Sequence, residues 1–490
     1  MHLVIEKVKN FFKSYCPDVI TAFEQLPKSG GDRIYFRITT ADNSYIATYN
    51  ENISENKTFL YLSAHFKSIN ANVPAIFDVH PDNKMYLQED FGSASLLNKL
   101  EQFGESEYVY DLFKKSLKNL AWLQIKGAEN FDTSFCLTSV EFGKQAILSD
   151  LLYFKYYFLD TLKIPYDKEK LLGDFDALSN YLTHVEHKYF MFRDFQSRNI
   201  CVKDNDVYFI DYQGGMNGAL QYDVASILWQ ARANLSDKWK TSLLEFYMEC
   251  VNDILEKPLD KSTFVSQYNG YVLIRLIQVL GAYGFRGLFE RKAQFLTSIP
   301  LALNNLKWFL ENKSMGISLP AFENIMKEIV KDEVIDQFKP IQADDSTDLV
   351  IRINSFSYLK SGYPEDTSSH GGGFVFDCRG LLNPGRFEEY KSLTGRNKPV
   401  IDFLEQQTKM PEFFNGICNV VDITVETYIK RNFSSLTINF GCTGGQHRSV
   451  YAADALARYL RNKYHVKIEL NHLEQDIHEK IGFDSVHENA

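Results

Sequence analysis

One stretch decides how the larger part of this 490-residue chain folds: Phe192-Arg193-Asp194-Phe195-Gln196-Ser197-Arg198-Asn199-Ile200-Cys201-Val202. Asp194 and Asn199 stand five positions apart in a polar segment that runs into a short strand, and twelve positions after Asn199 a second strand leads to Asp211. Phosphoryl transfer needs a carboxylate that orients or deprotonates the acceptor hydroxyl, and oxygen ligands that hold magnesium against the nucleotide phosphates. The catalytic loop of protein kinases places its Asp and Asn at the same spacing. The stretch therefore favours phosphoryl-transfer chemistry.

These residues resemble the catalytic segment of the aminoglycoside phosphotransferase and choline kinase superfamily, and within it the AmgK-like branch of amino-sugar kinases. In that branch the segment reads like His-Arg-Asp-Tyr-His-Ser-Arg-Asn, and here Phe192 and Gln196 replace the two histidines. The resemblance covers about residues 1–330. The matching positions are Arg193, Asp194, Ser197, Arg198, Asn199, Ile210, Asp211, Gln213, Tyr222 and Asp223.

The resemblance implies a role for the acidic and amide side chains. Asp194 would be the catalytic base, Asn199 and Asp211 would bind Mg²⁺, and Asp223 would brace the catalytic loop from a helix N-terminus. The nucleotide would be ATP, and the acceptor would be a small-molecule sugar. Asp and Asn are also common in ordinary turns, but the order and context of the whole set favour the kinase interpretation.

Two further segments resemble nucleotide-binding parts of the same branch. Ser29-Gly30-Gly31-Asp32-Arg33 resembles the turn that covers the phosphates, where glycine lets backbone N–H groups approach; taken alone, it equally fits a hairpin turn. Gln88-Glu89-Asp90-Phe91-Gly92 resembles the hinge, so Glu89 and Phe91 are expected near the adenine. The third-strand lysine of protein kinases is absent from Ser44–Tyr49, which argues against a protein kinase and leaves the nucleotide preference open.

The pattern of elements predicts a bilobal kinase-like fold. A small β-rich lobe is expected over residues 1–92, a helical lobe over 93–330 and a linker over 331–347. The elements expected in the first lobe are helices over 1–25 and 54–69, the latter capped by Ser54, and strands at 34–38, 44–49, 75–79 and 85–88. Helices are expected over about 105–190 and 223–311, with strands at 200–202 and 207–212 between them.

From residue 348 to 490 the pattern changes to strands that alternate with helices. Strands are expected at 349–355, 373–378, 434–440 and 465–470, and helices near 399–407, 415–430 and 447–462. Such alternation predicts an open α/β sheet. The chain is therefore expected to combine an α+β kinase-like part with a separate α/β domain.

A glycine-rich loop, Gly441-Cys442-Thr443-Gly444-Gly445-Gln446-His447-Arg448-Ser449, lies between the strand expected at 434–440 and the helix expected at 447–462. Glycine N–H groups, a helix N-terminus and an arginine together suit a phosphate. The loop resembles that of the RapZ C-terminal domain, and the segments Asn354–Pro364 and Val375–Pro384 extend the resemblance over about 348–475. It implies that the domain binds a sugar phosphate. The candidate phosphate-binding residues are Cys442, Thr443, Gly444, Gly445, Gln446, His447, Arg448 and Ser449.

Two rival interpretations of this domain stay open. Cys442, followed after five residues by Arg448-Ser449, also fits the phosphate loop of cysteine phosphatases, in which a thiolate is the nucleophile; Gly441 stands where that class usually has His. RNA binding, which the RapZ resemblance also raises, needs clustered Lys and Arg. The segment Asn471–Lys480 is acidic on balance, so RNA binding is a minority hypothesis.

Composition limits the other possibilities. A net charge of −10 and a pI of about 5.7 argue against a large nucleic-acid surface. The seven cysteines form no CxxC pair, and no run of 18 apolar residues or signal-peptide pattern occurs, so we expect a cytoplasmic protein without a membrane partner. The sequence predicts a sugar kinase, of amino-sugar type, joined to a sugar-phosphate-binding domain; the alternative is a regulatory adapter that binds nucleotide without turnover. The acceptor and the oligomeric state stay open.

Overall fold

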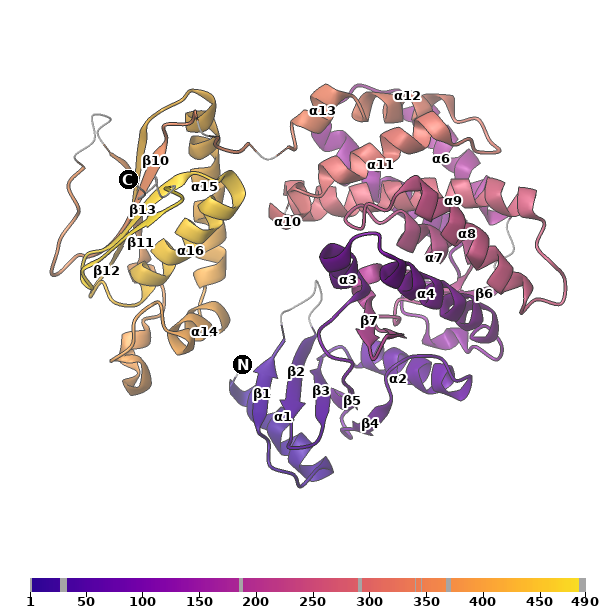
Figure 1. Ribbon diagram of the computed structural model, residues 1–490, viewed down its shortest axis with the longest axis horizontal. Helices are drawn as coiled ribbons and strands as arrows, with labels where there is room; N and C mark the ends of the chain where they lie inside the picture. The colour runs from indigo at the N-terminus through magenta and orange to yellow at the C-terminus, as the bar shows by residue number, and fades with distance from the viewer. Residues whose placement is uncertain are drawn as a thin grey trace, which may run out of the picture. The chain divides into compact units, whose positions relative to one another are not determined.

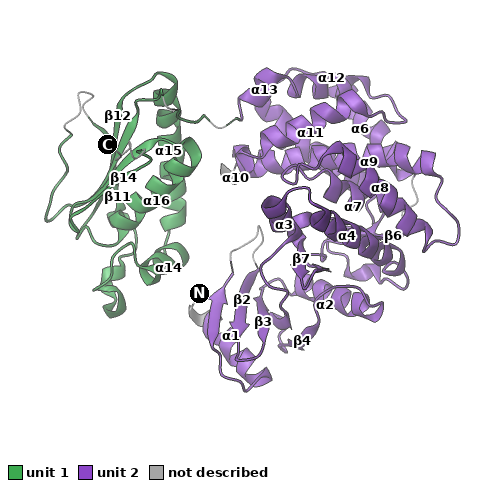
Figure 2. Cartoon of the chain, in the orientation of Figure 1, with its two compact units in different colours: residues 1, 339–490 green, residues 2–338 purple. Residues whose placement is uncertain are grey.

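The computed structural model describes residues 2–26, 33–184, 188–289, 293–339, 341–344, 346–366 and 372–483. The chain divides into two compact units, one of residues 2–338 and one from residue 339 onward (Figure 2). Each unit has its own hydrophobic core.

The first part of the larger unit is a five-stranded antiparallel sheet in the order β1-β2-β3-β5-β4 (Figure 1). Its strands are β1 (Ala22–Gln25), β2 (Ile34–Thr39), β3 (Ser44–Tyr49), β4 (Ile76–Val79) and β5 (Met85–Glu89), and its helices are α1 (His2–Tyr15) and α2 (Ile53–Ser68). The strands predicted at 34–38 and 44–49 are confirmed, and they form an antiparallel hairpin with Ile34 paired to Tyr49. Val8 and Phe12 of α1 pack in one cluster with Phe36 of β2.

Two details of this lobe correct the sequence-based expectation. A helix over residues 1–25 is wrong at its end, because α1 stops at Tyr15 and Ala22–Gln25 form a strand whose first residue pairs with Thr39. Pro17 explains the stop, since the residue before a proline is disfavoured in helical conformation. The cap of α2 is Asn52 rather than Ser54, and its side chain accepts a hydrogen bond from the Glu55 N–H at 3.2 Å.

The second part of this unit is helical, as predicted. It contains two short antiparallel pairs: β6 (Tyr189–Met191) with β9 (Met216–Gly218), and β7 (Ile200–Lys203) with β8 (Asp206–Phe209). The helices are α3 (Leu96–Phe103), α4 (Glu107–Lys126), α5 (Lys144–Phe154), α6 (Lys168–Thr183), α7 (Leu220–Leu228), α8 (Asp237–Asn252), α9 (Lys261–Tyr283), α10 (Ala293–Leu296), α11 (Ile299–Asn312), α12 (Pro320–Ile329) and α13 (Asp332–Asp336). A β lobe, a helical lobe and hairpin β7–β8 between them make the bilobal kinase-like fold.

Helix α9 runs through the core of the helical lobe. Within the described residues, the segment Lys261–Phe289 is the one stretch of helix with the length and apolar composition of a membrane span, and 56% of its most apolar window is buried inside the protein. A buried core helix has the same composition.

The smaller unit is an open α/β sheet in the order β11-β12-β10-β13-β14. Its strands are β10 (Val350–Ser357), β11 (Gly373–Asp377), β12 (Ser435–Cys442), β13 (Lys467–His472) and β14 (Ile477–Ile481), and its helices are α14 (Lys398–Gln407), α15 (Met410–Lys430) and α16 (Arg448–Tyr464). β14 is antiparallel to β13 and the other pairs are parallel. Ile353, Ile438 and Leu456 lie in one core cluster. The alternating α/β pattern is confirmed; β14 was not predicted, because its short charged sequence carries little apolar signal.

Candidate active site

The loop between β6 and β7 carries Asp194. A buried carboxyl group, that of Asp223, accepts hydrogen bonds from the backbone of this loop. Asp223, in the first turn of α7, accepts hydrogen bonds from the N–H groups of Phe192 at 2.7 Å and Arg193 at 3.0 Å. It also accepts one from the Gln124 amide at 3.0 Å. Asp223 is fully buried, and this burial raises its pKa to about 7 although the three hydrogen bonds oppose the rise. The loop therefore rests on the helix as the sequence predicted.

A second anchor fixes the loop from the side. Arg193 has a φ of 76°, in the left-handed region, and its guanidinium contacts both carboxylate oxygens of Asp150 on α5, at 2.7 and 2.9 Å. The guanidinium also donates to the Tyr222 hydroxyl at 2.5 Å. Arg193 thus joins α5 and α7 to the loop at the residue directly before Asp194.

Asp194, Asn199 and Asp211 come together at the front of the loop. Nδ2 of Asn199 lies 3.2 Å from Oδ2 of Asp194 and 3.4 Å from Oδ2 of Asp211. Arg275 of α9 lies 3.5 Å from Oδ1 of Asp194, and Arg198 lies 3.3 Å from its Oδ2. Burial raises the pKa of Asp194, but the charges of Arg275 and Arg198 outweigh this effect and hold the pKa below its ordinary value. Asp194 is therefore an ionised carboxylate.

The donor set at this point fits magnesium rather than zinc. Asn199 and Asp211 supply amide and carboxylate oxygens, which hard cations prefer. Among the described residues no group of three or more His, Cys, Asp or Glu side chains is placed to hold a metal. Magnesium is commonly held by one or two protein carboxylates together with substrate phosphates and water, so two protein ligands are enough for a nucleotide-bound ion.

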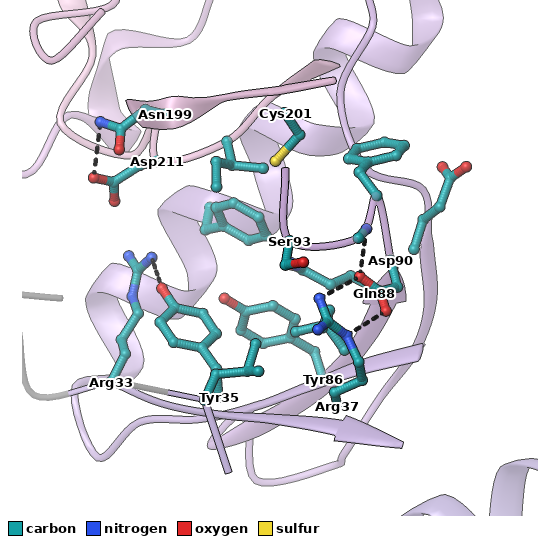
Figure 3. A pocket seen from close by; sticks show the side chains of 17 residues that line it. Arg33, Tyr35, Arg37, Tyr86, Gln88, Asp90, Ser93, Asn199, Cys201 and Asp211 are labelled. Atoms are coloured by element: carbon teal, nitrogen blue, oxygen red, sulfur yellow. Dashed lines mark hydrogen bonds and ion pairs between the residues drawn. The ribbon is translucent and has the colours of Figure 1, made fainter. Parts of the chain in front are cut away.

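A cavity of about 420 Å³ opens between the β lobe and this loop (Figure 3). Asn199 and Asp211 line one part of its wall, and the strand end Glu89-Asp90-Phe91-Gly92 lines another. The predicted hinge residues Glu89 and Phe91 are thus in the same cavity as the predicted metal ligands. The other lining residues are Leu26, Arg33, Tyr35, Arg37, Ile46, Phe59, Tyr86, Gln88, Ser93, Cys201 and Ile210. Ser29, Gly30, Gly31 and Asp32 lie outside the described residues.

Three charged residues of this site were not predicted from the sequence; one is buried and two are half-buried. Arg37 of β2 forms a two-point ion pair with Asp90, at 2.7 and 3.1 Å, and so fixes the hinge from inside the cavity. Glu55 of α2 pairs with Arg33 at 2.7 Å. Arg275 approaches the catalytic loop from 81 residues further along the chain (275 − 194). No local pattern marks these residues, because each acts through a partner distant in sequence.

In the smaller unit, the glycine-rich loop between β12 and α16 wraps around a thiol. Sγ of Cys442 accepts a hydrogen bond from the Gly445 N–H at 3.2 Å and lies 3.1 Å from the Ser449 hydroxyl. Gly445 has a φ of 65°, and a Cβ there would lie 2.3 Å from Glu474, so only glycine fits. Thr443 is exposed on the outer side of the loop.

The larger side chains of this loop contact backbone carbonyls of the segment 379–393. Gln446 donates to the carbonyls of residues 391 and 393, at 2.8 and 2.7 Å. His447 contacts the carbonyl of residue 390 at 2.9 Å, and burial lowers its pKa. Arg448 is buried and donates to the carbonyls of residues 379 and 381, at 3.2 and 2.8 Å. A direct role of these three side chains in phosphate binding stays a prediction.

Known protein sequences match the smaller unit. Residues 349–476 match the family model of the RapZ C-terminal domain. Among curated proteins, a "nucleotide-binding protein" of Glaesserella parasuis is 40% identical over 135 residues, which are 28% of this chain and 45% of that protein. A "nucleotide-binding protein" of Endomicrobium trichonymphae is 42% identical over 120 residues, which are 24% and 39% of the two chains. This chain thus spans less than half the length of these relatives.

Solved structures resemble a larger share of the chain at low identity. Choline kinase LicA from Streptococcus pneumoniae is 14% identical, covers 63% of this chain and 99% of its own, and has a TM-score of 0.43. A choline kinase from Cryptosporidium parvum is 14% identical over 66% and 99% of the two chains, with a TM-score of 0.46. The ADP-bound aminoglycoside phosphotransferase APH(2'')-Ib is 13% identical over 62% and 98%, with a TM-score of 0.42.

Proposed function

We propose that the chain is an ATP-dependent phosphotransferase that acts on a hydroxyl of a sugar, of the amino-sugar class, and that its C-terminal unit binds a sugar phosphate. One observation carries the kinase part: Asp194 contacts Asn199, which together with Asp211 lines the same cavity as the hinge residues Glu89 and Phe91. A base, two oxygen ligands for a hard cation and an apolar cleft are the parts that phosphoryl transfer requires.

Residues in different parts of the cleft would bind the adenine, hold the metal and orient the acceptor. Ile46 and Ile210 supply apolar walls for the adenine beside Glu89 and Phe91. Asn199 and Asp211 would hold Mg²⁺, which neutralises charge on the phosphates when it is bound. Asp194, fixed through the backbone contacts of the loop, would accept the acceptor's hydrogen bond and orient its hydroxyl.

The seven cysteines are free thiols, which supports a reducing, cytoplasmic setting.

For the C-terminal unit, the match to the RapZ C-terminal domain and the glycine-rich loop at the start of α16 support sugar-phosphate binding. A specific geometry also favours a second candidate, a cysteine phosphatase. Sγ of Cys442 accepts the Gly445 N–H and lies 3.1 Å from the Ser449 hydroxyl, so the sulfur lies within the glycine-rich loop, where a phosphatase would place its nucleophile. Arg448, however, donates to two backbone carbonyls, so it would have to leave them to cover a phosphate.

A single assay tests the kinase proposal. The protein is incubated with Mg-ATP and a panel of amino sugars and neutral sugars, and ADP release is measured. ADP release that depends on an amino sugar is the expected result. Nucleotide binding without sugar-dependent ADP release would instead support the regulatory adapter.

A further inference from the structure

The third strand of the sheet offers no cation to the nucleotide. Ile46 of β3 lines the cavity, and Thr48 stands two positions further on the same face. Thr48 is fully buried and uncharged. In protein kinases a lysine of this strand pairs both the α- and β-phosphates and a helix glutamate. A nucleotide in this cavity therefore needs another cation.

Arg33 supplies a cation to the same cavity from the neighbouring strand. It stands directly before β2, which pairs with β3, and it lines the cavity together with Asn199 and Asp211 (Figure 3). Its side chain is only 6% exposed. One Nη donates to Glu55 at 2.7 Å and the other to the Tyr35 hydroxyl at 3.3 Å. Nε is buried and has no hydrogen-bond partner among the described residues. Each Nη carries two hydrogens and uses one of them in these contacts, so the guanidinium keeps Nη donors for a ligand.

Glu55 is itself held in place by the start of α2. Its Oε2 accepts a hydrogen bond from the Asn50 amide at 2.9 Å, and its N–H donates to the capping side chain of Asn52 at 3.2 Å. The Asn50 side chain in turn accepts from the Asn52 N–H at 3.0 Å. These contacts fix the carboxylate that faces Arg33, so the guanidinium is oriented before any ligand arrives.

We propose that the Arg33–Glu55 ion pair replaces the lysine–glutamate pair of kinases, with Arg33 as the residue that binds the phosphates of the nucleotide and Glu55 as its positioning residue. This inference rests on the proposed function. An arginine is always charged and offers a planar fork of donors, which suits two phosphate oxygens at once. The cation comes from the residue directly before β2 and the glutamate from α2, so the pair is built on a different strand from the one that carries the lysine in protein kinases.

The test compares ADP with adenosine, because the inferred contact is to phosphate alone. Calorimetry on the full-length protein, with and without magnesium, measures both ligands for wild type, Arg33→Met, Arg33→Lys and Glu55→Gln. Arg33→Met should weaken ADP binding by about 30-fold or more, as loss of a charged partner does, and change adenosine binding by less than about twofold. Arg33→Lys should fall between, because lysine keeps the charge without the fork.

The role of Glu55 has its own signature. Glu55→Gln should weaken ADP binding less than Arg33→Met, and the double variant should bind ADP no more weakly than Arg33→Met, because Glu55 acts through Arg33. Arg232→Met is the matched control: Arg232 pairs with Glu101 at 3.0 Å on the exposed surface of the helical lobe, and its loss should change neither ligand.

The outcomes separate the two proposals. A wild-type protein that binds neither ADP nor adenosine would overturn the nucleotide site itself. A wild type that binds both, with an Arg33→Met variant that binds ADP equally well or loses adenosine in parallel, overturns the Arg33 inference alone. If Arg33→Met does not fold, Arg33→Lys decides: ADP weakened with adenosine kept supports the inference, and unchanged ADP affinity rejects it.

Discussion

Two loops of this molecule follow a strand and carry the polar residues expected of a phosphate site, but they use them in opposite ways. The catalytic loop is anchored from outside, by Asp223 and by the Arg193–Asp150 pair. Its own Asn199 therefore stays at the cavity wall. The glycine-rich loop of the smaller unit anchors its surroundings instead, because Gln446 and Arg448 bind backbone carbonyls.

The difference shows what a motif specifies and what it leaves to the fold. A motif fixes residue types and spacing, whereas the neighbours decide which groups must satisfy buried backbone atoms. Where α7 and α5 meet that need, Asn199 of the loop faces the cavity. Where the segment 379–393 depends on the loop, Gln446 and Arg448 are already engaged, so an anion bound there would rely mainly on backbone N–H groups.

The largest effect is expected at the cavity. Asp211→Ala removes one of two oxygen ligands, so turnover should fall by about 100-fold and more magnesium should be needed for the residual activity. Steady-state rates over a magnesium titration measure both. Residual activity with an unchanged magnesium dependence would show that Asp211 does not bind the metal. The contrast between a ligand-binding site at the cavity and a loop whose side chains are engaged by the protein would then be weaker.

Arg448→Ala should lower the stability of the smaller unit, and any loss of sugar-phosphate binding should follow from that loss of stability. The variant leaves the two carbonyls of residues 379 and 381 without their charged donor, so the smaller unit should lose about 2 kcal/mol of unfolding free energy. Sugar-phosphate binding should fall with it, while kinase turnover is kept. Denaturant unfolding measures the change, with Arg458→Ala on the exposed side of the same helix as control. Lost binding at full stability would show that Arg448 contacts the ligand instead.

The anchor of the catalytic loop predicts a pH dependence. The folded-state pKa of Asp223 is about 7, above its ordinary value of 3.8, so the folded chain keeps a proton that the unfolded chain releases. Its stabilising contribution is full below pH 3.8 and is lost as pH rises through about 7, at up to about 1.4 kcal/mol per pH unit. Unfolding free energies at pH 5, 6 and 7 should fall less steeply for Asp223→Asn than for wild type.

Asp111→Asn, at an exposed position on α4, is the control for that measurement and should leave the slope unchanged. Equal slopes for wild type and Asp223→Asn would mean that Asp223 stays ionised under the loop.

The smallest effect is expected from Cys442→Ser. If the thiol only packs in the loop, sugar-phosphate binding should change by less than about twofold, since serine is close in size. A cysteine phosphatase makes the opposite demand: wild type should release phosphate from an aryl phosphate, and Cys442→Ser should not. Phosphate release that depends on Cys442 would give the glycine-rich loop a catalytic role, and the two loops would then no longer differ in function.

The sequence predicted the order of elements better than their limits. The strands at 34–38 and 44–49 and the alternating α/β pattern were readable because strand and helix periodicities differ. Helix α1 was extended too far, although Pro17 marks its end, and β14 escaped notice because an edge strand needs few apolar residues. Local signals therefore gave the architecture, and long-range pairing set its details.

Residues of the site were recognisable in the sequence where they belong to a motif, such as the loop with Asp194 or the hinge with Glu89 and Phe91. Asp194 and Asn199 share one loop, and their proximity follows from the motif. Arg33–Glu55 and Arg275–Asp194 join residues far apart in the chain, and nothing in their surroundings marks them as partners. The direction of Arg448 was equally hidden, because it depends on carbonyls of a distant segment.

The most direct measurement of the central claim is made on Asp194→Asn. ADP binding by calorimetry and sugar-dependent ADP release are determined on the same preparation, beside wild type. If Asp194 is the catalytic base at the front of an intact nucleotide cavity, ADP binding should stay within about twofold and turnover should fall by about 100-fold or more. Turnover near the wild-type rate with ADP binding intact would contradict the account.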